Sequence, residues 1–429
     1  MKKFFKFSLI SVLIVTTAFA IFKVSNKYRV SLLKDNIDCS VVTKGCDGAK
    51  SITVDDNGEI YIGYSDSIKN IDSEGKEKLI YKNKDLNIED VKYSNNKIYY
   101  ISKNMIQSFD LQNGEVETIS ENIPLSGNGI ERKLLINKNN MYVSIGSLTN
   151  SGIDEGFGFD KSPIDIILNG VNYGEDKTGA FKEKGTESSE GERIKKSEVG
   201  NAALYEVDLS NGKLKLYSSG IRGITGIDYN SKGELMAIFS GMENKGVRPV
   251  NRDSDYIYKV NNGSWYGWPD FSGGDPIDSP RFKGDDVIKN IIKNHPNKMI
   301  EAPIYQAKSV DSLKEMAIDR EGTIIPKDSM LFWDRSEETI CALNKDGVFY
   351  RVLKLNEQSY IDDIIYNLDE FLILDSSLGC IYSLHEQEGL LGFKLPVEVW
   401  VFVFLLTFIL LIISLLKLRN FKDSNINKM

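Results

Sequence analysis

The sequence predicts an all-β protein, a six-bladed β-propeller with a C-terminal transmembrane helix and an N-terminal signal peptide or anchor. Three observations predict this architecture: a pattern of paired strands occurs six times, the composition favours strands, and uncharged runs lie near both termini. Twenty Tyr, twenty Phe and thirty-five Gly against only ten Pro are typical of strands joined by tight turns rather than of a helical bundle.

The repeated pattern is an apolar strand, a turn rich in Asp, Asn or Gly, and a second alternating strand. The six copies are residues 52–63, 91–102, 134–146, 227–239, 316–333 and 364–374. Alternation around a polar turn is the pattern of two antiparallel strands in a half-buried sheet. Further strand pairs follow some copies, as at residues 67–81 and 203–217. Repeated four-stranded units predict a propeller over residues 51–388, because its radial closure leaves only short edges.

Two insertions interrupt the repeat. Early copies lie about 40 residues apart, but the spacing is about 90 residues on either side of the fourth copy. The first insertion, residues 154–200, is dense in Gly, Lys and Glu. This composition is typical of a solvated loop, and a binding lid is the alternative.

The N-terminus begins with basic residues and continues with an apolar run over residues 7–22. The segment Ala18-Phe19-Ala20 resembles a small-residue cleavage site. The run is shorter than the ~20 residues that a spanning helix prefers. Residues 1–26 are therefore either a cleaved signal peptide or an uncleaved anchor, and residues 27–50 are expected to be a linker.

The C-terminal run over residues 399–416 contains no charge and is followed at once by Lys417, Arg419 and Lys422. Its length fits a transmembrane helix, and its basic flank belongs on the cytoplasmic side. The sequence thus predicts a linker over 389–398, a transmembrane helix over 399–416 and a cytoplasmic tail over 417–429. The propeller is expected on the extracytoplasmic face of the cell membrane.

Charge and histidine content exclude several classes of function. With 61 acidic and 53 basic residues the net charge is −8, so a nucleic acid is not an expected partner. The chain has only two histidines, His295 and His385, and neither lies in a motif. This argues against a Ser-His-Asp triad and against a histidine zinc site.

The four cysteines leave the disulfide state open. Cys39 and Cys46 would close a short loop, and Cys341 and Cys380 lie in two strand-rich stretches. Two local bridges and free buried thiols are both compatible with this spacing.

Oxygen-bearing side chains alternate just before one predicted strand. Asn251, Asp253 and Asp255 lie within residues 250–256. Calcium takes several oxygen ligands, which alternate side chains and loop carbonyls supply. We expect a calcium site here.

A family resemblance rests on the same region. Asp253-Ser254-Asp255-Tyr256, followed by Trp265-Tyr266-Gly267-Trp268-Pro269-Asp270-Phe271, resembles the glucose/sorbosone dehydrogenase family. Residues 142–150 and 219–223 are similar to further segments of that family. The resemblance spans about residues 50–386 and implies a six-bladed propeller that uses pyrroloquinoline quinone (PQQ) and calcium to oxidise sugars.

The resemblance implies specific roles, and the sequence departs from some of them. It implies that Arg222 pairs with a PQQ carboxylate and that Asp255 is a calcium ligand. Gly129 stands roughly where the family has its catalytic histidine, which leaves Glu131 as the nearby candidate base. Gly223 replaces the family's asparagine, and residues 360–363 offer no late-blade arginine.

Two classes of function follow from these departures. One is a tethered PQQ-dependent sugar dehydrogenase that oxidises an aldose or a similar sugar. The other is a non-catalytic surface propeller that binds a glycan or a protein partner. A calcium-dependent lactonase-type hydrolase shares the blade number, but its ligands are not identifiable in this sequence.

Overall fold

The computed structural model describes residues 27–127, 130–138, 140–284, 287–297, 299–387 and 408. Val30–Glu386 form one compact unit. The predicted N-terminal segment 1–26, the linker 389–398, the transmembrane helix 399–416 and the tail 417–429 lie outside the described residues, Phe408 apart. Within the described part of the chain, no helix is both long and apolar enough to span a membrane.

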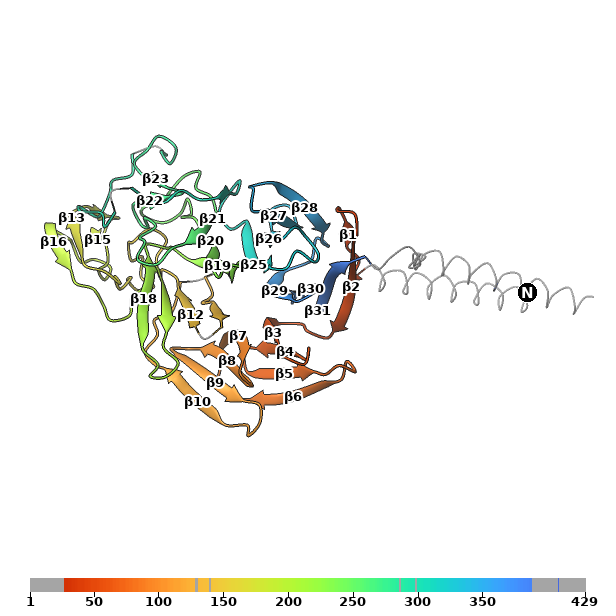
Figure 1. Ribbon diagram of the computed structural model, residues 1–429. Coiled ribbons are helices and arrows are strands. Elements are labelled where there is room, and N and C mark those ends of the chain that lie inside the picture. Colours follow the sequence, from red (N-terminus) through yellow and green to blue (C-terminus); the bar gives the residue numbers. More distant parts are fainter. Residues whose placement is uncertain are drawn as a thin grey trace, which may run out of the picture. The chain divides into compact units, whose positions relative to one another are not determined.

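The compact unit is a six-bladed propeller, as the sequence predicts (Figure 1). Each of the six repeats forms the two innermost strands of one blade. In chain order the blades are β3 (Ala49–Val54), β4 (Ile60–Tyr64), β5 (Ser67–Ile71) and β6 (Glu77–Lys82); β7 (Ile88–Ser94), β8 (Lys97–Ser102), β9 (Met105–Asp110) and β10 (Val116–Ser120); β11 (Leu134–Asn137), β12 (Asn140–Ile145), β17 (Ala203–Val207) and β18 (Leu214–Ser219); β19 (Ile224–Tyr229), β20 (Leu235–Phe239), β21 (Tyr256–Val260) and β24 (Tyr305–Gln306); β25 (Leu313–Asp319), β26 (Ser329–Asp334), β27 (Thr339–Leu343) and β28 (Phe349–Lys354); and β29 (Ile361–Asn367), β30 (Glu370–Asp375) and β31 (Cys380–Glu386), completed by β2 (Ile37–Lys44).

The N-terminal strand closes the ring. β2 pairs antiparallel with β31 and becomes the outermost strand of the last blade, so both ends of the propeller share one sheet (Figure 1). A short strand, β1 (Ser31–Leu32), extends the fifth blade beside β28. The prediction of a linker over residues 27–50 is therefore wrong. Without β2 the edge of β31 would expose unpaired backbone groups.

One kind of tight turn joins strands of both inner and outer hairpins. Four such turns begin with Asp or Asn and place glycine three residues later, at Asp55, Asp72, Asn230 and Asn344. In each, one side-chain oxygen accepts the N–H groups two and four residues further on. The glycine has φ between 78° and 84°, a region in which L side chains are strained.

The innermost strands β3, β7, β11, β19, β25 and β29 surround a central channel. Polar side chains join neighbouring blades there by accepting a backbone N–H from the next innermost strand. Thr53 accepts from Tyr93 at 2.9 Å, Asp90 from Leu134 at 2.7 Å, Asp228 from Ile318 at 2.8 Å and Asp363 from Ile52 at 3.0 Å. These bonds fix the register between blades.

A β-bulge lies at the beginning of five of the innermost strands. The bulged residues are Lys50, Glu89, Thr225, Glu315 and Asp362, all of them polar. Bulges re-aim a side chain and are common at the rims of barrels. We call the side of the ring where the innermost strands begin the start face, and the opposite side the end face.

The two insertions pack against each other and are not solvated loops. The first contains the hairpins β13 (Ile166–Asn169) with β16 (Glu190–Ile194) and β14 (Asn172–Tyr173) with β15 (Thr178–Gly179). The second, residues 261–304 between β21 and β24, contains β22 (Phe271–Ser272) and β23 (Asp275–Pro276). An isolated β-bridge between Leu168 and Ile292 joins the two insertions. Both contribute to one apolar core that includes Phe181, Trp265 and Trp268. We call this pair of insertions the cap.

The cysteines are all described, and the structure contains neither of the disulfides that the spacing allows. Cys46, Cys341 and Cys380 are buried. Burial raises the pKa of the Cys46 thiol to about 11 and that of Cys341 to about 12. Thiols held in the protonated form are weak nucleophiles, so these side chains act as small apolar residues of the core.

Candidate functional site

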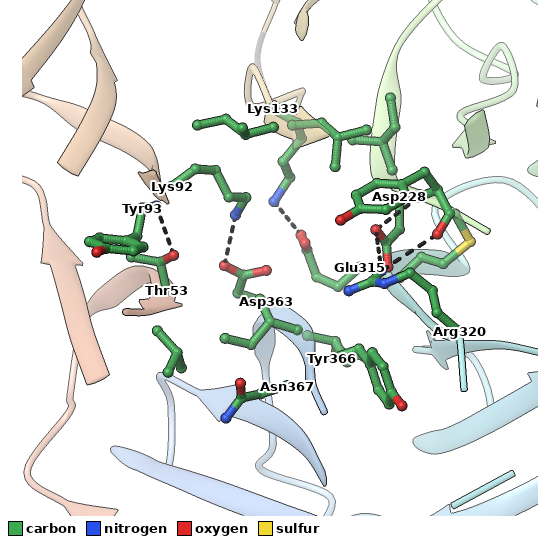
Figure 2. Close-up of a pocket in the computed structure, with 18 residues that line it drawn as sticks. Thr53, Lys92, Tyr93, Lys133, Asp228, Glu315, Arg320, Asp363, Tyr366 and Asn367 are labelled. Atoms are coloured by element: carbon green, nitrogen blue, oxygen red, sulfur yellow. Dashed lines mark hydrogen bonds and ion pairs between the residues drawn. The ribbon is translucent and has the colours of Figure 1, made fainter. Parts of the chain in front are cut away.

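Two cavities lie along the channel, and their charges are arranged differently. The end-face cavity, of about 260 Å³, is lined by all six innermost strands (Figure 2). The start-face cavity, of about 300 Å³, is lined by loops and strand ends of blades three to six. Both are polar, so the pairing of the charged side chains decides which one is available to a ligand.

In the channel the buried charges are matched with one another. Lys133 pairs with Glu315 at 2.6 Å, and Lys92 contacts Asp363 at 3.4 Å (Figure 2). Lys92 also binds Asp90 at 2.8 Å. Burial raises the pKa of the Glu315 carboxyl well above its usual range, although Lys133 opposes the shift. Burial also acts on Asp363, but Lys92 and Lys133 outweigh it and keep the pKa of that carboxyl below its usual value. These pairs stabilise the folded ring. Among the residues that line the end-face cavity, every lysine and arginine has a carboxylate partner, so none is available to a ligand.

Arg222 and its neighbours line one side of the start-face cavity. Arg222 follows β18, and its guanidinium binds Glu243 at 2.9 Å. The other oxygen of Glu243 binds Lys245 at 2.8 Å, so one carboxylate serves two cations. Nε of Arg222 is buried and has no acceptor among the described residues.

The opposite side of the cavity repeats this arrangement. Asp311 binds both Arg335 at 2.5 Å and Lys314 at 3.2 Å. Both cations lie over the ring of Tyr360, at 5.6 Å and 6.0 Å from its centroid. Cation–π contact holds such side chains in place without neutralising their charge.

The start-face cavity thus carries cationic charge that no carboxylate matches individually. Four basic side chains line it, and two carboxylates are shared among them. The third acid, Asp255, turns both oxygens toward backbone N–H groups of Gly241, Ser312 and Leu313. The arrangement suits a ligand with a carboxylate or another anionic group.

The calcium site expected at Asn251, Asp253 and Asp255 does not form as one cluster. Asp255 accepts three backbone N–H groups, and burial raises its pKa to about 6. Asp253 accepts from Met242 N–H and from the hydroxyls of Tyr256 and Ser272. A cation would have to displace these donors, so the oxygens do not fit it in this arrangement. The described residues contain no group of three acidic, His or Cys side chains that would hold a metal.

The one candidate base predicted from the sequence, Glu131, is poorly placed for proton abstraction because it pairs with Lys50 at 3.2 Å. Gly129, which stands where the family has its histidine, lies outside the described residues. Both histidines of the sequence are elsewhere. His295 lies between Trp265 and Phe271 in the cap and contacts Asp270 at 3.1 Å. His385 is on β31 and pairs across the sheet with Asp38 and Glu370.

Sequence reasoning found Arg222 but missed Lys245, Lys314 and Arg335. These residues belong to no motif and are three of 53 basic residues. Their position in the fold was one usable signal: Lys314 directly precedes Glu315, the bulged residue at the beginning of β25. Residues at the beginning of each innermost strand lie on the start face.

Comparisons with known proteins agree on the fold. No protein-family profile matches the chain, and no characterised protein matches its sequence significantly. Among solved structures, the PQQ domain of pyranose dehydrogenase from Coprinopsis cinerea is similar, with a TM-score of 0.58 and 12% identity over 84% of this chain and 97% of that one. The PQQ-bound aldose sugar dehydrogenase from Streptomyces coelicolor has a TM-score of 0.54 and 12% identity over 84% and 98%.

A third similar structure is the calcium structure of a Trichoderma reesei carbohydrate-active enzyme of family AA12, with a TM-score of 0.57 and 14% identity over 84% of this chain and 98% of that one. At these identities the comparisons establish the fold. The resemblance to PQQ-dependent sugar dehydrogenases is therefore confirmed at the level of the six-bladed propeller.

Proposed function

We propose that this chain is a membrane-tethered, extracytoplasmic propeller that binds an acidic sugar or glycan in its start-face cavity. The observation that carries the proposal is the pair of shared carboxylates, Glu243 and Asp311, each between two cations. An incoming carboxylate gains charge-assisted hydrogen bonds there. A sugar is favoured over a small anion because Thr225, Ser240 and Tyr360 also line the cavity.

Recognition is favoured over oxidation by the placement of the bases. Removing a hydroxyl proton needs a group within hydrogen-bond reach whose oxygen or nitrogen can accept it. Both oxygens of Asp255 already accept backbone N–H groups, and Glu131 is held by Lys50. Neither residue is arranged as a base in this structure.

A PQQ-dependent sugar dehydrogenase is the second candidate. Two observations favour it: the similar solved structures, and the fit of the four cations to a tricarboxylate. Arg222, Lys314 and Arg335 would hold the carboxylates of the quinone, which when bound would accept the hydride of a sugar. The oxygens of Asp253 and Asp255 do not fit the accompanying calcium ion.

The membrane part of the proposal rests on the two apolar runs of the sequence, residues 7–22 and 399–416. The basic flanks at both ends favour a cytoplasmic position for the termini. Protease treatment of intact cells should then release the propeller into the medium. Complete protection of the chain in cells whose envelope is shown to admit the protease would contradict this topology.

Titration calorimetry of the purified protein tests the ligand. We expect D-galacturonate to bind, D-galactose to bind at least tenfold more weakly, and the affinity for galacturonate to fall as salt is raised. The double substitution Lys314→Gln/Arg335→Gln should abolish the preference for the acid. Arg351→Gln, which removes an exposed cation on the outer strand of the same blade, is the matched control.

The same protein separates the two candidates. A second titration uses PQQ with calcium, followed by sugar and an artificial electron acceptor. Sugar-dependent reduction would establish the dehydrogenase. Equal binding of galacturonate and galactose, or no binding of either, would contradict recognition of acidic sugars.

A further inference from the structure

An unusually exposed aromatic side chain lines a cavity next to the start-face cavity. Phe157 has 83% of its surface exposed and lines this cavity of about 360 Å³ together with Leu125 and Leu148. We call it the Phe157 cavity. A single exposed apolar residue is ordinary on a protein surface. Its position at the edge of a cavity, and the rigidity of the loop that carries it, set Phe157 apart.

The loop is fixed by one buried carboxylate. Oδ1 of Asp154 accepts the N–H groups of Gly156, Phe157 and Gly158 at 2.7, 3.1 and 3.0 Å. Burial acts to raise the pKa of Asp154, but these backbone donors outweigh it and hold the pKa below its usual value. Gly156 and Gly158 have φ of 108° and 110°, which a residue with a side chain rarely adopts. The ring is thus presented from a defined backbone.

The loop is also tied to the cationic side of the site. The side chain of Asn150 accepts Glu243 N–H and donates to Glu243 C=O, each at 2.8 Å. Oε1 of Glu155 accepts Val247 N–H at 2.9 Å. The segment that carries Glu243 and Lys245 and the loop that carries Phe157 are therefore held together as one unit.

The Phe157 cavity adjoins the start-face cavity. Ile130, Arg222 and Lys245 line both of them. A ligand group bound at Arg222 therefore has space beside it in the Phe157 cavity, which Leu148 and Thr149 also line. The start-face cavity is cationic, and the Phe157 cavity presents an aromatic ring and two leucines.

We propose that Phe157 forms a second sugar subsite, so that the ligand is an acidic oligosaccharide rather than a monosaccharide. The inference rests on the proposed function of the start-face cavity. The acidic unit binds the shared-carboxylate cations, and the adjoining unit lays the C–H face of its ring on Phe157. An aromatic face carries partial negative charge and attracts the partially positive hydrogens of such a face. A rigid loop makes this contact at a small cost in conformational entropy.

Chain-length dependence tests the subsite. The probes are mono-, di- and trigalacturonic acid, titrated into the full-length protein by calorimetry. In the wild type, affinity should rise about tenfold from the monomer to the dimer, in line with the gain from one stacked ring. Phe157→Ala should lose that rise while keeping the affinity for the monomer, and Phe157→Trp should retain it.

The matched control is Leu368→Ala, which removes an apolar side chain that is 74% exposed in the β29–β30 turn and should leave every affinity unchanged. Equal wild-type affinity for all three lengths would overturn the subsite alone, as would a Phe157→Ala variant that keeps the rise. A lack of binding by every length would overturn the proposed function and the subsite with it.

Discussion

The central channel and the start-face cavity contain the same types of charged side chain, but these side chains are paired in different ways. In the channel Lys133 and Glu315 pair one to one at 2.6 Å, with 7% and 9% of their side-chain surfaces exposed. At the start face Asp311 is shared by Lys314 and Arg335. The side chains of Asp311 and Arg335 are 55% and 43% exposed, whereas that of Lys314 is 12% exposed. Glu315 of the channel and Lys314 of the start face are neighbours at the beginning of β25, so the local backbone alone does not account for the difference.

The exposed fraction of the charged side chains explains this difference. A buried ion must be paired, because an unpaired one has a large desolvation cost. A half-exposed cation keeps part of its hydration and gains less from a fixed partner. Matched buried pairs therefore stabilise the ring, whereas a shared exposed carboxylate leaves a half-exposed cation such as Arg335 that a ligand can contact.

The largest effect is expected from breaking the channel pair. Lys133→Met would leave the carboxylate of Glu315 buried and close to Asp363. We expect the free energy of unfolding to fall by about 3–5 kcal/mol. The loss should be smaller at pH 5 than at pH 8, because Glu315, whose pKa is already raised, can take up a proton. Urea unfolding at the two pH values measures both effects.

The comparison variant is Arg335→Met, which breaks the exposed pair with Asp311. Its free energy of unfolding should change by less than about 1 kcal/mol. Equal losses in the two variants would show that burial is not what distinguishes the channel from the start face.

A second effect is pH dependence at the boundary between the two regions. Burial raises the pKa of Asp362 to about 6, and Ser376, which donates a hydrogen bond to it, only partly opposes the shift. The unfolded value is near 3.9. Since the folded state binds the proton more tightly, this contribution to stability is fully present below about pH 4 and is lost as the pH rises through 6.

Asp362→Asn removes that titration. Relative to the wild type, the variant should gain on the order of 2 kcal/mol in unfolding free energy between pH 4 and pH 7. Urea unfolding across this range measures it, with Asp346→Asn in an exposed turn as the control. A constant difference between variant and wild type at all pH values would contradict the raised pKa.

The fold was more predictable from sequence than the site. Strand alternation around polar turns is a local signal, and it locates the two innermost strands of every blade. The pairing of β2 with β31 joins residues more than 300 positions apart. Residues 37–44 contain no turn signal and no copy of the repeat that would predict this pairing. Long-range pairing of this kind is set by the open edge of the last blade and not by the segment itself.

The site depends on the same kind of long-range contact. Arg222 was found because its neighbours resemble a family segment, whereas Lys314 and Arg335 come together only when β25 and β26 pair. The alternating acids of residues 251–255 predicted a calcium site, but in the structure their oxygens do not form one cluster. Their oxygens accept N–H groups of Met242, Gly241 and Ser312, which sequence spacing does not show.

An effect on stability as small as that of Arg335→Met, together with a gain in binding, is expected from Asp311→Asn. Asp311 has φ of 55°, a conformation that asparagine tolerates well, so the loop should keep its shape. Unfolding free energy should change by less than about 1 kcal/mol. With the shared carboxylate gone, Lys314 and Arg335 both become available, and galacturonate should bind about fivefold more tightly and with a steeper dependence on salt.

Calorimetry at two salt concentrations measures this change. Asp275→Asn is the control, because it removes an exposed carboxylate that pairs with one arginine of the cap and should leave binding unchanged. Weaker binding by Asp311→Asn would mean that the carboxylate orients the two cations for the ligand. In that case the start face would resemble the channel, with its charges fixed by their partners rather than left available to a ligand.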